Sequence, residues 1–320
     1  MAANPLSFGI KTSPANVGYP DLVRVWREAD QIPEIEHAWL YDHLLPNVGG
    51  RIGDPSGSVF EAWTLLAALA AQTERLRLGV LVTNNRIRRP AVLAKIAATV
   101  DVISSGRLDF GIGVGGLPDG ALISPEYDAY GIEIAQWGDA VASCAEACTI
   151  IRKMWTEEAF DFEGQHYRLS GARCDPKPIQ RPHPPVLIAG TGAATLRIVA
   201  QHANVWNALG PPTNSVERLQ QRSVALDGYC AAIGRDPRTI TRSVQLPISY
   251  GDPAQIRALL PAVVDAGFTH AVLNVPPPYP DGVARWVADE VIKPSLGGRR
   301  SLNRWRPDSS PRSSRAMPRD

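Results

Sequence analysis

The sequence predicts an α/β fold in which helices and strands alternate along the chain. Helical runs at Trp63–Gln72 and Ala91–Ile103 each lead into a short, continuously apolar segment, Leu76–Val82 and Leu108–Val114 respectively. Continuously apolar segments joined by helices are typical of parallel strands that are buried on both faces. A repeated unit of this kind over 320 residues leaves two architectures open, a doubly wound sheet and a closed (β/α)8 barrel.

Eight segments along the chain have the character of buried strands, and helices follow most of them. In chain order they are Phe8–Lys11, Ala38–Tyr41, Leu76–Val82, Leu108–Val114, Val186–Ala189, Val205–Ala208, Ser243–Ile248 and Ala271–Val275. The count of eight matches a closed barrel, in which the chemistry lies where the strands end and the following loops begin.

Composition and charge narrow the class of protein. No apolar run approaches the roughly 18 residues that cross a membrane, and the first residues lack a signal-peptide pattern, so we expect a cytoplasmic protein. The four cysteines show no spacing typical of a metal site, and none is expected. Residues 297–320 hold seven arginines and two aspartates, which predicts a disordered tail on an acidic body and no nucleic-acid role. The 28 arginines against five lysines suit a high-GC, for example actinobacterial, genome.

Four of the expected strands end in polar or glycine-rich segments. These segments are HAWLYDHLLP (37–46), GVLVTNNRIRRP (79–90), GIGVGGLPDG (111–120) and PVLIAGTGAATLRIV (185–199). The third contains Gly111, Gly113 and Gly116 in a GxGxxG pattern. A dinucleotide-binding fingerprint needs a helix directly after it to receive the pyrophosphate, and the two prolines that follow give no helical period. We therefore reject the dinucleotide interpretation.

Taken together, the sequence resembles the bacterial luciferase-like superfamily, and most closely its deazaflavin (F420)-dependent oxidoreductases. The resemblance extends from Phe8 to Val275. It rests on the segments WLYDH, EAWTLLAALAAQTERLRLG, RRPAVLAKIAATVDVISSGRLDFGIGVG, EGQHYRL, PKPIQRPHPPVLIAG and HANVWNA. It implies a (β/α)8 TIM barrel, a homodimer paired through the helix Trp63–Gln72, and F420 as cofactor, with FMN as the alternative.

The segment at about 157–184 lies between the fourth helix and the fifth strand. It is long and rich in proline, and only Phe160–Tyr167 within it has strand character. We interpret it as an insertion that covers the barrel and expect residues 1–296 to form one domain.

The resemblance also implies where the cofactor phosphate binds. It points to Gly190, Thr191 and Gly192, where small residues let backbone N–H groups approach an anion at the start of the next helix. An ordinary glycine turn with Thr191 as helix cap is the alternative. Trp206 is expected to lie in the core or to form part of the pocket wall beside the cofactor.

Further residues are expected around the cofactor ring. Relatives carry a bulge with a non-proline cis peptide behind the ring, and the resemblance places it near Leu81–Val82. Thr83 and Asn85 follow at the mouth of the barrel and can bind ring or ribityl oxygens. Gly115 is expected to leave room for the flat ring.

Asp42 and His43 follow the second strand and are the expected catalytic pair, in contact with the cofactor. After a hydride is delivered to a substrate carbon, the neighbouring atom needs a proton, and imidazole is a natural donor near neutral pH. The alternative is that Asp42 caps the next segment while His43 binds the backbone. Gly116 and Ala15 stand where sugar-phosphate-oxidising relatives carry acidic residues, so a sugar phosphate is not expected.

These observations predict an oxidoreductase that uses reduced F420. We expect it to transfer a hydride to an activated C=C or C=N bond of a small-molecule or peptide-derived substrate. Two alternatives remain open: a two-component monooxygenase that uses reduced FMN, and a barrel that binds a cofactor without catalysis.

Overall fold

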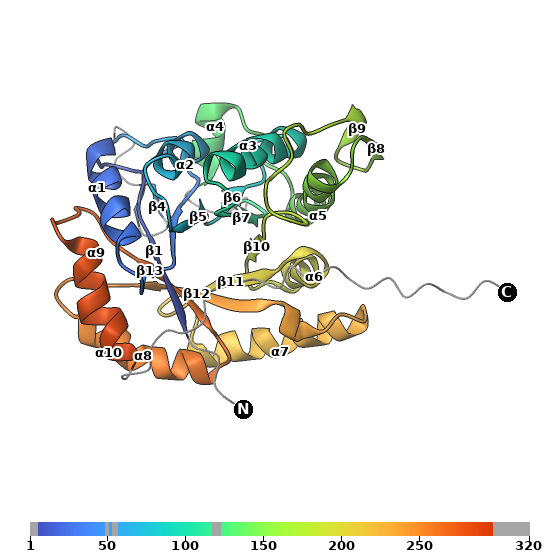
Figure 1. Cartoon of the computed structure of the whole chain (residues 1–320). Helices are drawn as coiled ribbons and strands as arrows, with labels where there is room; N and C mark the ends of the chain where they lie inside the picture. The colour runs from blue at the N-terminus through green and yellow to red at the C-terminus, as the bar shows by residue number, and fades with distance from the viewer. Residues whose placement is uncertain (1–5, 49–50, 53–56, 117–122, 297–320) are drawn as a thin grey trace.

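The computed structural model describes residues 6–48, 51–52, 57–116 and 123–296. Within them, eight parallel strands close into a barrel surrounded by helices (Figure 1). The barrel strands are β1 (Ser7–Lys11), β2 (His37–Leu40), β5 (Arg77–Val80), β7 (Leu108–Gly113), β10 (Val186–Ala189), β11 (Val205–Leu209), β12 (Thr241–Pro247) and β13 (His270–Asn274). Each coincides with a strand expected from the sequence, so the (β/α)8 prediction is confirmed.

The barrel closes because the two ends of the sheet pair with each other. β13 pairs with β1 in parallel, and β10 pairs with β7 in parallel, with Val186 opposite Phe110. The two-residue strand β6 (Thr83–Asn84) adds a further pairing to β7 just beyond the end of β5. Short antiparallel pairs lie outside the barrel: β3 (Asn47–Val48) with β4 (Arg51–Ile52), and β8 (Phe160–Glu163) with β9 (Arg168–Ala172).

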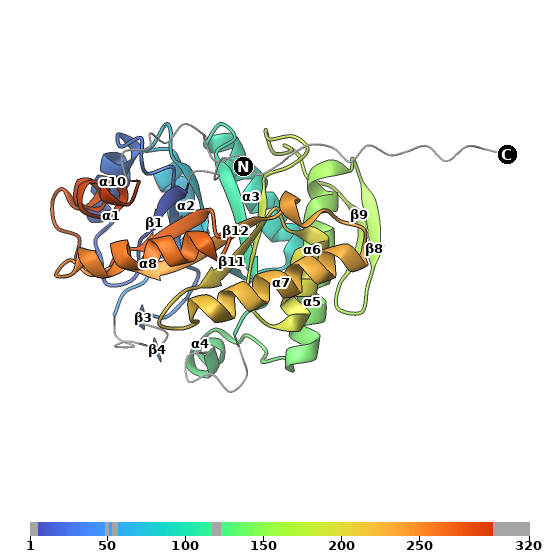
Figure 2. The same ribbon diagram turned by 90° about the horizontal axis from the view of Figure 1, so that it is seen from below.

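The helices form the outer layer. They are α1 (Tyr19–Asp30), α2 (Ala62–Ala70), α3 (Pro90–Ile103), α4 (Ile123–Tyr130), α5 (Trp137–Thr156), α6 (Ala193–His202), α7 (Val216–Ala232), α8 (Pro253–Asp265), α9 (Val283–Trp286) and α10 (Lys293–Ser295). A 3-10 turn (Pro237–Thr239) and a π-helical segment (Val287–Ile292) complete them. Seen from below, α5, α6 and α7 follow one another around the barrel (Figure 2). None of the helices within the described ranges is long and apolar enough to cross a membrane.

Strand alternation divides the apolar residues into two clusters. Residues such as Phe8, Ile10 and Trp206 point outward into the large core between strands and helices. A separate small cluster fills the barrel itself and consists of Trp39, Leu81, Leu187, Val205 and Val272. This inner cluster blocks the barrel below its mouth, as expected for a packed barrel of eight strands.

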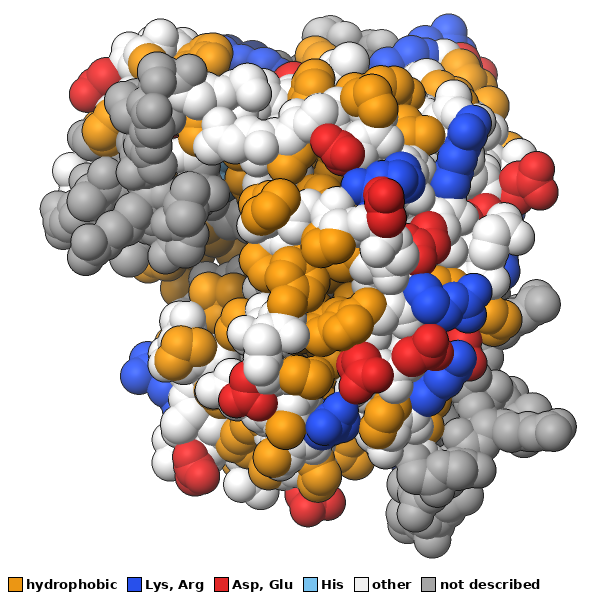
Figure 3. Space-filling model, turned by 90° about the vertical axis from the view of Figure 1, so that its left-hand side faces the viewer, with side chains coloured by type: hydrophobic (Ala, Val, Ile, Leu, Met, Phe, Trp, Pro, Cys, Tyr) orange, Lys and Arg blue, Asp and Glu red, His pale blue; other side chains and the backbone are white. Residues whose placement is uncertain are grey.

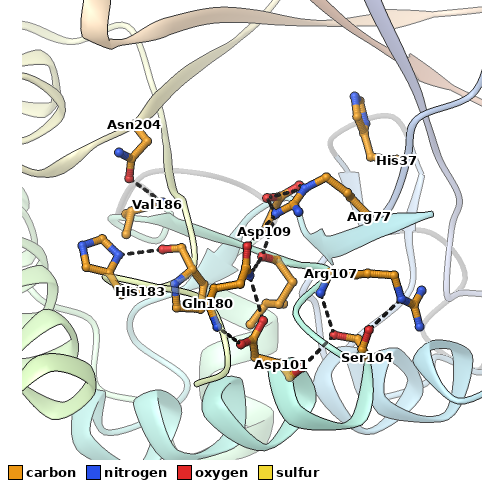
Figure 4. A network of polar contacts seen from close by, with 12 residues as sticks. His37, Arg77, Asp101, Ser104, Arg107, Asp109, Gln180, His183, Val186 and Asn204 are labelled. Atoms are coloured by element: carbon orange, nitrogen blue, oxygen red, sulfur yellow. Dashed lines mark hydrogen bonds and ion pairs between the residues drawn. The ribbon is translucent and has the colours of Figure 1, made fainter. Parts of the chain in front are cut away.

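A polar network closes the floor of the barrel beneath this cluster. His37 and His270 are fully buried and hydrogen-bond to each other, and Trp39 donates its indole N–H to His37 Nδ1 over 2.8 Å. Burial lowers the pKa of His270 to about 3, so its imidazole is neutral at pH 7. Beside them, Arg77 donates Nε to both carboxylate oxygens of Asp109, at 3.1 and 3.0 Å (Figure 4).

The segment before β10 is tied to the same floor. Gln180 donates its side-chain amide to Asp101 Oδ1 and to the Leu108 carbonyl, both over 2.7 Å (Figure 4). The hairpin of β8 and β9 packs on the outer side of α5, where Glu146 accepts the backbone N–H groups of residues 165–167. The expected insertion therefore forms a hairpin on the outer wall. Its Tyr167 hydroxyl lies 3.5 Å from Asn85 Nδ2 at the mouth.

Candidate active site

The end of β5 carries the irregular backbone that the sequence predicted. The Leu81–Val82 peptide is cis, and β6 begins at the next residue. Leu81 is buried in the inner cluster and donates its backbone N–H to the Leu40 carbonyl over 2.7 Å. Val82 is only partly buried and packs against that cluster at the carboxyl end of the barrel. The expected non-proline cis peptide at Leu81–Val82 is confirmed, while the contact of Val82 with a flat ring stays a prediction.

Thr83 and Asn85 differ in where they point. The Thr83 hydroxyl is fully buried and accepts the indole N–H of Trp63 over 3.1 Å, so this side chain supports the wall toward α2. Asn85 is also buried, but its Oδ1 has no hydrogen-bond partner in the structure. A buried amide oxygen without a partner costs about 1–3 kcal/mol. A ligand that donates a hydrogen bond to Asn85 would remove this cost, which fits the expected contact with a cofactor.

Asp42 is held firmly by its neighbours. Arg88 binds both of its carboxylate oxygens, at 2.7 and 3.0 Å, and the Asn84 backbone N–H donates to Oδ2 over 3.0 Å. The Asp42 side chain is inaccessible to solvent. Asp42 thus holds the loop after β5 in place through Arg88 and the Asn84 backbone. Its catalytic role beside His43 stays a prediction.

His43 is paired instead with a residue that the sequence did not suggest. Its Nδ1 lies 3.1 Å from Glu126 Oε2, and the Glu126 side chain is 1% exposed against 25% for His43. Glu126 Oε1 also accepts the backbone N–H groups of Leu44 and Leu45. Burial alone would raise the pKa of Glu126, but the hydrogen bonds from His43 and these two amides lower it. An ionised Glu126 thus orients the ring and leaves His43 Nε2 for a substrate.

The segment after β10 has the features expected of a phosphate cradle. Gly190 has φ +135°, and a Cβ there would lie 2.9 Å from Thr195 Cγ2. Gly192 is the N-cap of α6, and it is exposed, while Thr191 is partly exposed. The first N–H groups of a helix have no partner within the helix, so they can bind an anion. Gly190, Thr191 and Gly192 together can therefore accept a phosphate.

Trp206 lies in the core, one of its two expected positions, and Gly115 packs closely against protein side chains. Trp206 is fully buried in the outer core beside Phe268, and its indole N–H donates to the Gly190 carbonyl over 2.7 Å. It braces the cradle and does not line the mouth. Gly115 has φ +97°, and a Cβ there would lie 2.7 Å from Asn84 Oδ1 and 3.0 Å from the Tyr127 hydroxyl. That space holds protein side chains, so close packing here requires a glycine, and room for a ring at this strand end stays a prediction.

The assembled site combines three elements at the carboxyl ends of the strands. A glycine-rich segment can bind an anion, a cis peptide presents Val82 to the mouth, and the His43–Glu126 pair can deliver or accept a proton. The sequence does not indicate Glu126, because this residue lies in α4, 83 positions from His43, within a segment that has no recognisable pattern. In the described residues, no group of three histidine, cysteine or acidic side chains is arranged to hold a metal ion.

Comparisons with known proteins agree with this architecture. The family model described as luciferase-like monooxygenase matches residues 6–287. A phthiodiolone/phenolphthiodiolone dimycocerosates ketoreductase of Mycobacterium sp. (strain JLS) is 33% identical over 201 residues, 61% of this chain and 49% of the relative. The chain thus spans about half the length of the curated ketoreductases it matches.

Two further comparisons cover more of both chains. An F420-dependent glucose-6-phosphate dehydrogenase of Kineococcus radiotolerans is 28% identical over 258 residues, 78% of this chain and 70% of the relative. The solved structure of an F420-dependent secondary alcohol dehydrogenase in complex with an F420–acetone adduct superposes with a TM-score of 0.75, covering 91% of this chain and 99% of that one. Because the two sequences are only 16% identical, the similarity to this structure shows a shared fold alone.

Proposed function

Because the chain belongs to the luciferase-like monooxygenase family, we propose that it is an oxidoreductase that uses F420 as its cofactor. The observation that carries the proposal is the His43–Glu126 pair beside the cis peptide, because hydride transfer to a polar double bond leaves an atom that needs a proton. Relatives such as the F420-dependent glucose-6-phosphate dehydrogenase support F420, and the partnerless Asn85 Oδ1 and the Gly190–Gly192 segment fit a ligand that carries donors and a phosphate.

In this proposal the bound deazaflavin supplies a hydride, and the protein binds and orients the cofactor and transfers the proton. Gly190, Thr191 and Gly192 hold the phosphate, and Val82 and Asn85 hold the ring and its side chain. Glu126 keeps the His43 imidazole oriented so that Nε2 can donate a proton to the reduced substrate or accept one in the opposite direction.

The bond that is reduced is part of the proposal. The relatives named above are a ketoreductase and a dehydrogenase of a sugar phosphate, which act at carbon–oxygen bonds. We therefore propose a carbonyl or the corresponding alcohol as the reacting group, while reduction of a C=C or C=N bond stays a prediction. Ala15 is buried and Gly116 carries no side chain, so the acidic residues of sugar-phosphate-oxidising relatives are missing and we do not propose a sugar phosphate.

The cofactor assignment predicts a clear preference in binding. The purified protein is expected to bind F420 with a dissociation constant in the micromolar range or lower. It should bind FMN at least about tenfold more weakly, a difference of about 1.4 kcal/mol in binding free energy. Fluorescence quenching of each cofactor on titration with protein measures both affinities. Equal or reversed affinities would favour the FMN-dependent monooxygenase, and tight F420 binding without turnover of any carbonyl or alcohol would favour a non-catalytic barrel.

A homodimer remains a proposal. The apolar residues of α2, such as Trp63 and Leu66, are buried against the chain's own barrel, while Ala67 and Ala68 are only partly buried. Next to α2, a surface cavity of ≈ 570 Å³ is lined by Tyr19, Pro20, Val23, Arg24, Arg27 and Gln72. Hydrophobic side chains gather on the face that carries α1 (Figure 3). Light scattering at micromolar concentration should give twice the mass of one chain, and a monomer mass would refute the dimer.

A further inference from the structure

The two sides of the barrel mouth differ in chemistry. On the side of β5, β7 and β10, the last inward-facing positions are small or apolar: Leu81, Gly113 and Ala189. On the side of β11, β12, β13 and β1, four inward-facing positions near the mouth are polar and form what we call the polar half: Asn207, Gln245, Asn274 and Lys11. Leu209 and Pro247 follow Asn207 and Gln245 as the last inward-facing residues of β11 and β12. The glycine cradle and the cis peptide both belong to the apolar side, so the polar half is left without a role in binding the cofactor.

A continuous chain of hydrogen bonds fixes the geometry of the polar half. The amide nitrogen of Gln245 donates to Asn207 Oδ1 over 2.7 Å, and Asn207 Nδ2 donates to Ser243 Oγ over 2.7 Å. Ser243 is bound in turn to His270 on the barrel floor. Because the nitrogen of Gln245 is used in this way, its oxygen is directed to the ammonium group of Lys11, which donates to it.

Lys11 lacks a counter-ion. In the described parts of the chain, no carboxylate forms an ion pair with its ammonium group, and its hydrogen-bond partner is the neutral Gln245. Burial lowers the pKa of Lys11 to about 8. Tyr279 binds Ser13 and adds no charge near pH 7, because burial raises its pKa above the usual value. The Lys11 side chain is partly buried. A cation withdrawn from water without an anionic partner is costly to folding, so a functional reason for keeping it is expected.

A second group in the polar half is also unsatisfied. Asn274 lies opposite Lys11 in the register of β13 and β1. Its Oδ1 is buried and has no hydrogen-bond partner in the structure. The polar half therefore offers a positive donor and a partnerless acceptor, a combination that fits a carbonyl or hydroxyl group on a ligand.

We propose that Lys11 binds the substrate through its reacting oxygen, so that the substrate is a ketone or the corresponding secondary alcohol. This inference rests on the proposed function. When the carbonyl is reduced, a hydride with its electron pair forms a new C–H bond, the π bond breaks, and its electrons move to the oxygen. The Lys11 ammonium stabilises the charge on that oxygen, and His43 supplies the proton that completes the alcohol. The cofactor is oxidised by two electrons in the same step.

The test compares Lys11→Met with wild type in the absence of cofactor. Methionine fills a similar volume without charge, so the variant should melt about 3 °C or more above wild type at pH 7. The difference in melting temperature between the variant and wild type should shrink toward pH 10. The Lys11 ammonium of the folded wild type loses its proton at a lower pH, about 8, than the same group in the unfolded chain. Added sodium formate, the smallest carboxylate, should raise the melting temperature of wild type relative to equal sodium chloride, and should have no such effect on the variant.

Lys177→Met is the matched control. Lys177 donates to the backbone carbonyls of Met154 and Glu157, far from the polar half, so its loss should lower the melting temperature and leave the formate response intact. The proposal is overturned if Lys11→Met melts below wild type, or if formate stabilises both proteins equally. F420 affinity should differ less than about twofold between wild type and Lys11→Met. Failure of wild type to bind F420 would overturn the proposed function and leave the result for Lys11 standing.

Discussion

Replacement of His43 by alanine is expected to reduce turnover by about 10²–10⁴-fold, the usual value of general acid–base catalysis. Cofactor affinity should fall far less, because in the proposed mechanism the imidazole, held by Glu126 through Nδ1, acts on the substrate and does not bind the cofactor. The measurement pairs F420 titration with the rate of cofactor oxidation or reduction on a ketone or secondary alcohol. Glu126→Gln, which keeps the shape but removes the charge, should lower turnover by a smaller factor.

His202→Ala is the control for this experiment. His202 lies at the end of α6, outside the barrel mouth, and its removal should leave turnover nearly unchanged. Near-normal turnover of His43→Ala together with a large loss of F420 affinity would make His43 a binding residue. The proton would then come from water, the substrate or Lys11.

The second large effect is expected at the cradle. Gly190→Asp should weaken F420 binding by about 10²–10³-fold, because it places a carboxylate and a Cβ where an anion has to approach backbone N–H groups. The Cβ would also press on Thr195 at 2.9 Å, and the φ of +135° is one that side chains rarely adopt. Equilibrium titration with F420 measures the loss.

Two controls separate charge from strain in this variant. Gly190→Ala adds the Cβ without the carboxylate, so it should bind F420 better than Gly190→Asp does. Gly267→Asp introduces the same side chain at another positive φ, +88°, where nothing lies within 4 Å of the Cβ, and should bind F420 normally. If Gly190→Asp is folded and binds F420 like wild type, the phosphate site lies elsewhere.

The fold was accessible from the sequence because its strands are continuously apolar and short. A continuously apolar segment such as Leu108–Val114, with helices before and after it, is best explained as a buried parallel strand. The structure places β7 at Leu108–Gly113. The family resemblance supplied what local pattern could not, the cis peptide at Leu81–Val82. Strand alternation decides between the two positions expected for Trp206: its neighbour Val205 fills the barrel, so Trp206 points outward into the core.

The site was less predictable because its key contacts join distant segments. Asp42 and His43 follow the same strand, but Arg88 holds the first and Glu126 orients the second. Arg88 opens one of the segments that carry the family resemblance, but nothing there indicates that it pairs with Asp42. Glu126 is marked by no motif and reaches His43 only through the placement of α4. Nothing in the sequence marks Lys11, which lies at the end of a strand. Its contact with Gln245 arises only when the barrel closes.

The closed floor has a consequence for the kinetics of any reaction in this barrel. His37, His270 and the Arg77–Asp109 pair seal the lower end, and Trp39, Leu187 and Val272 fill the space above them. Ligands therefore enter and leave by the mouth alone. Two ligands that share one opening bind in sequence, and the one that lies deeper has to arrive first and depart last. The protein is thus expected to follow an ordered sequential mechanism, visible as product inhibition that is competitive with one ligand only.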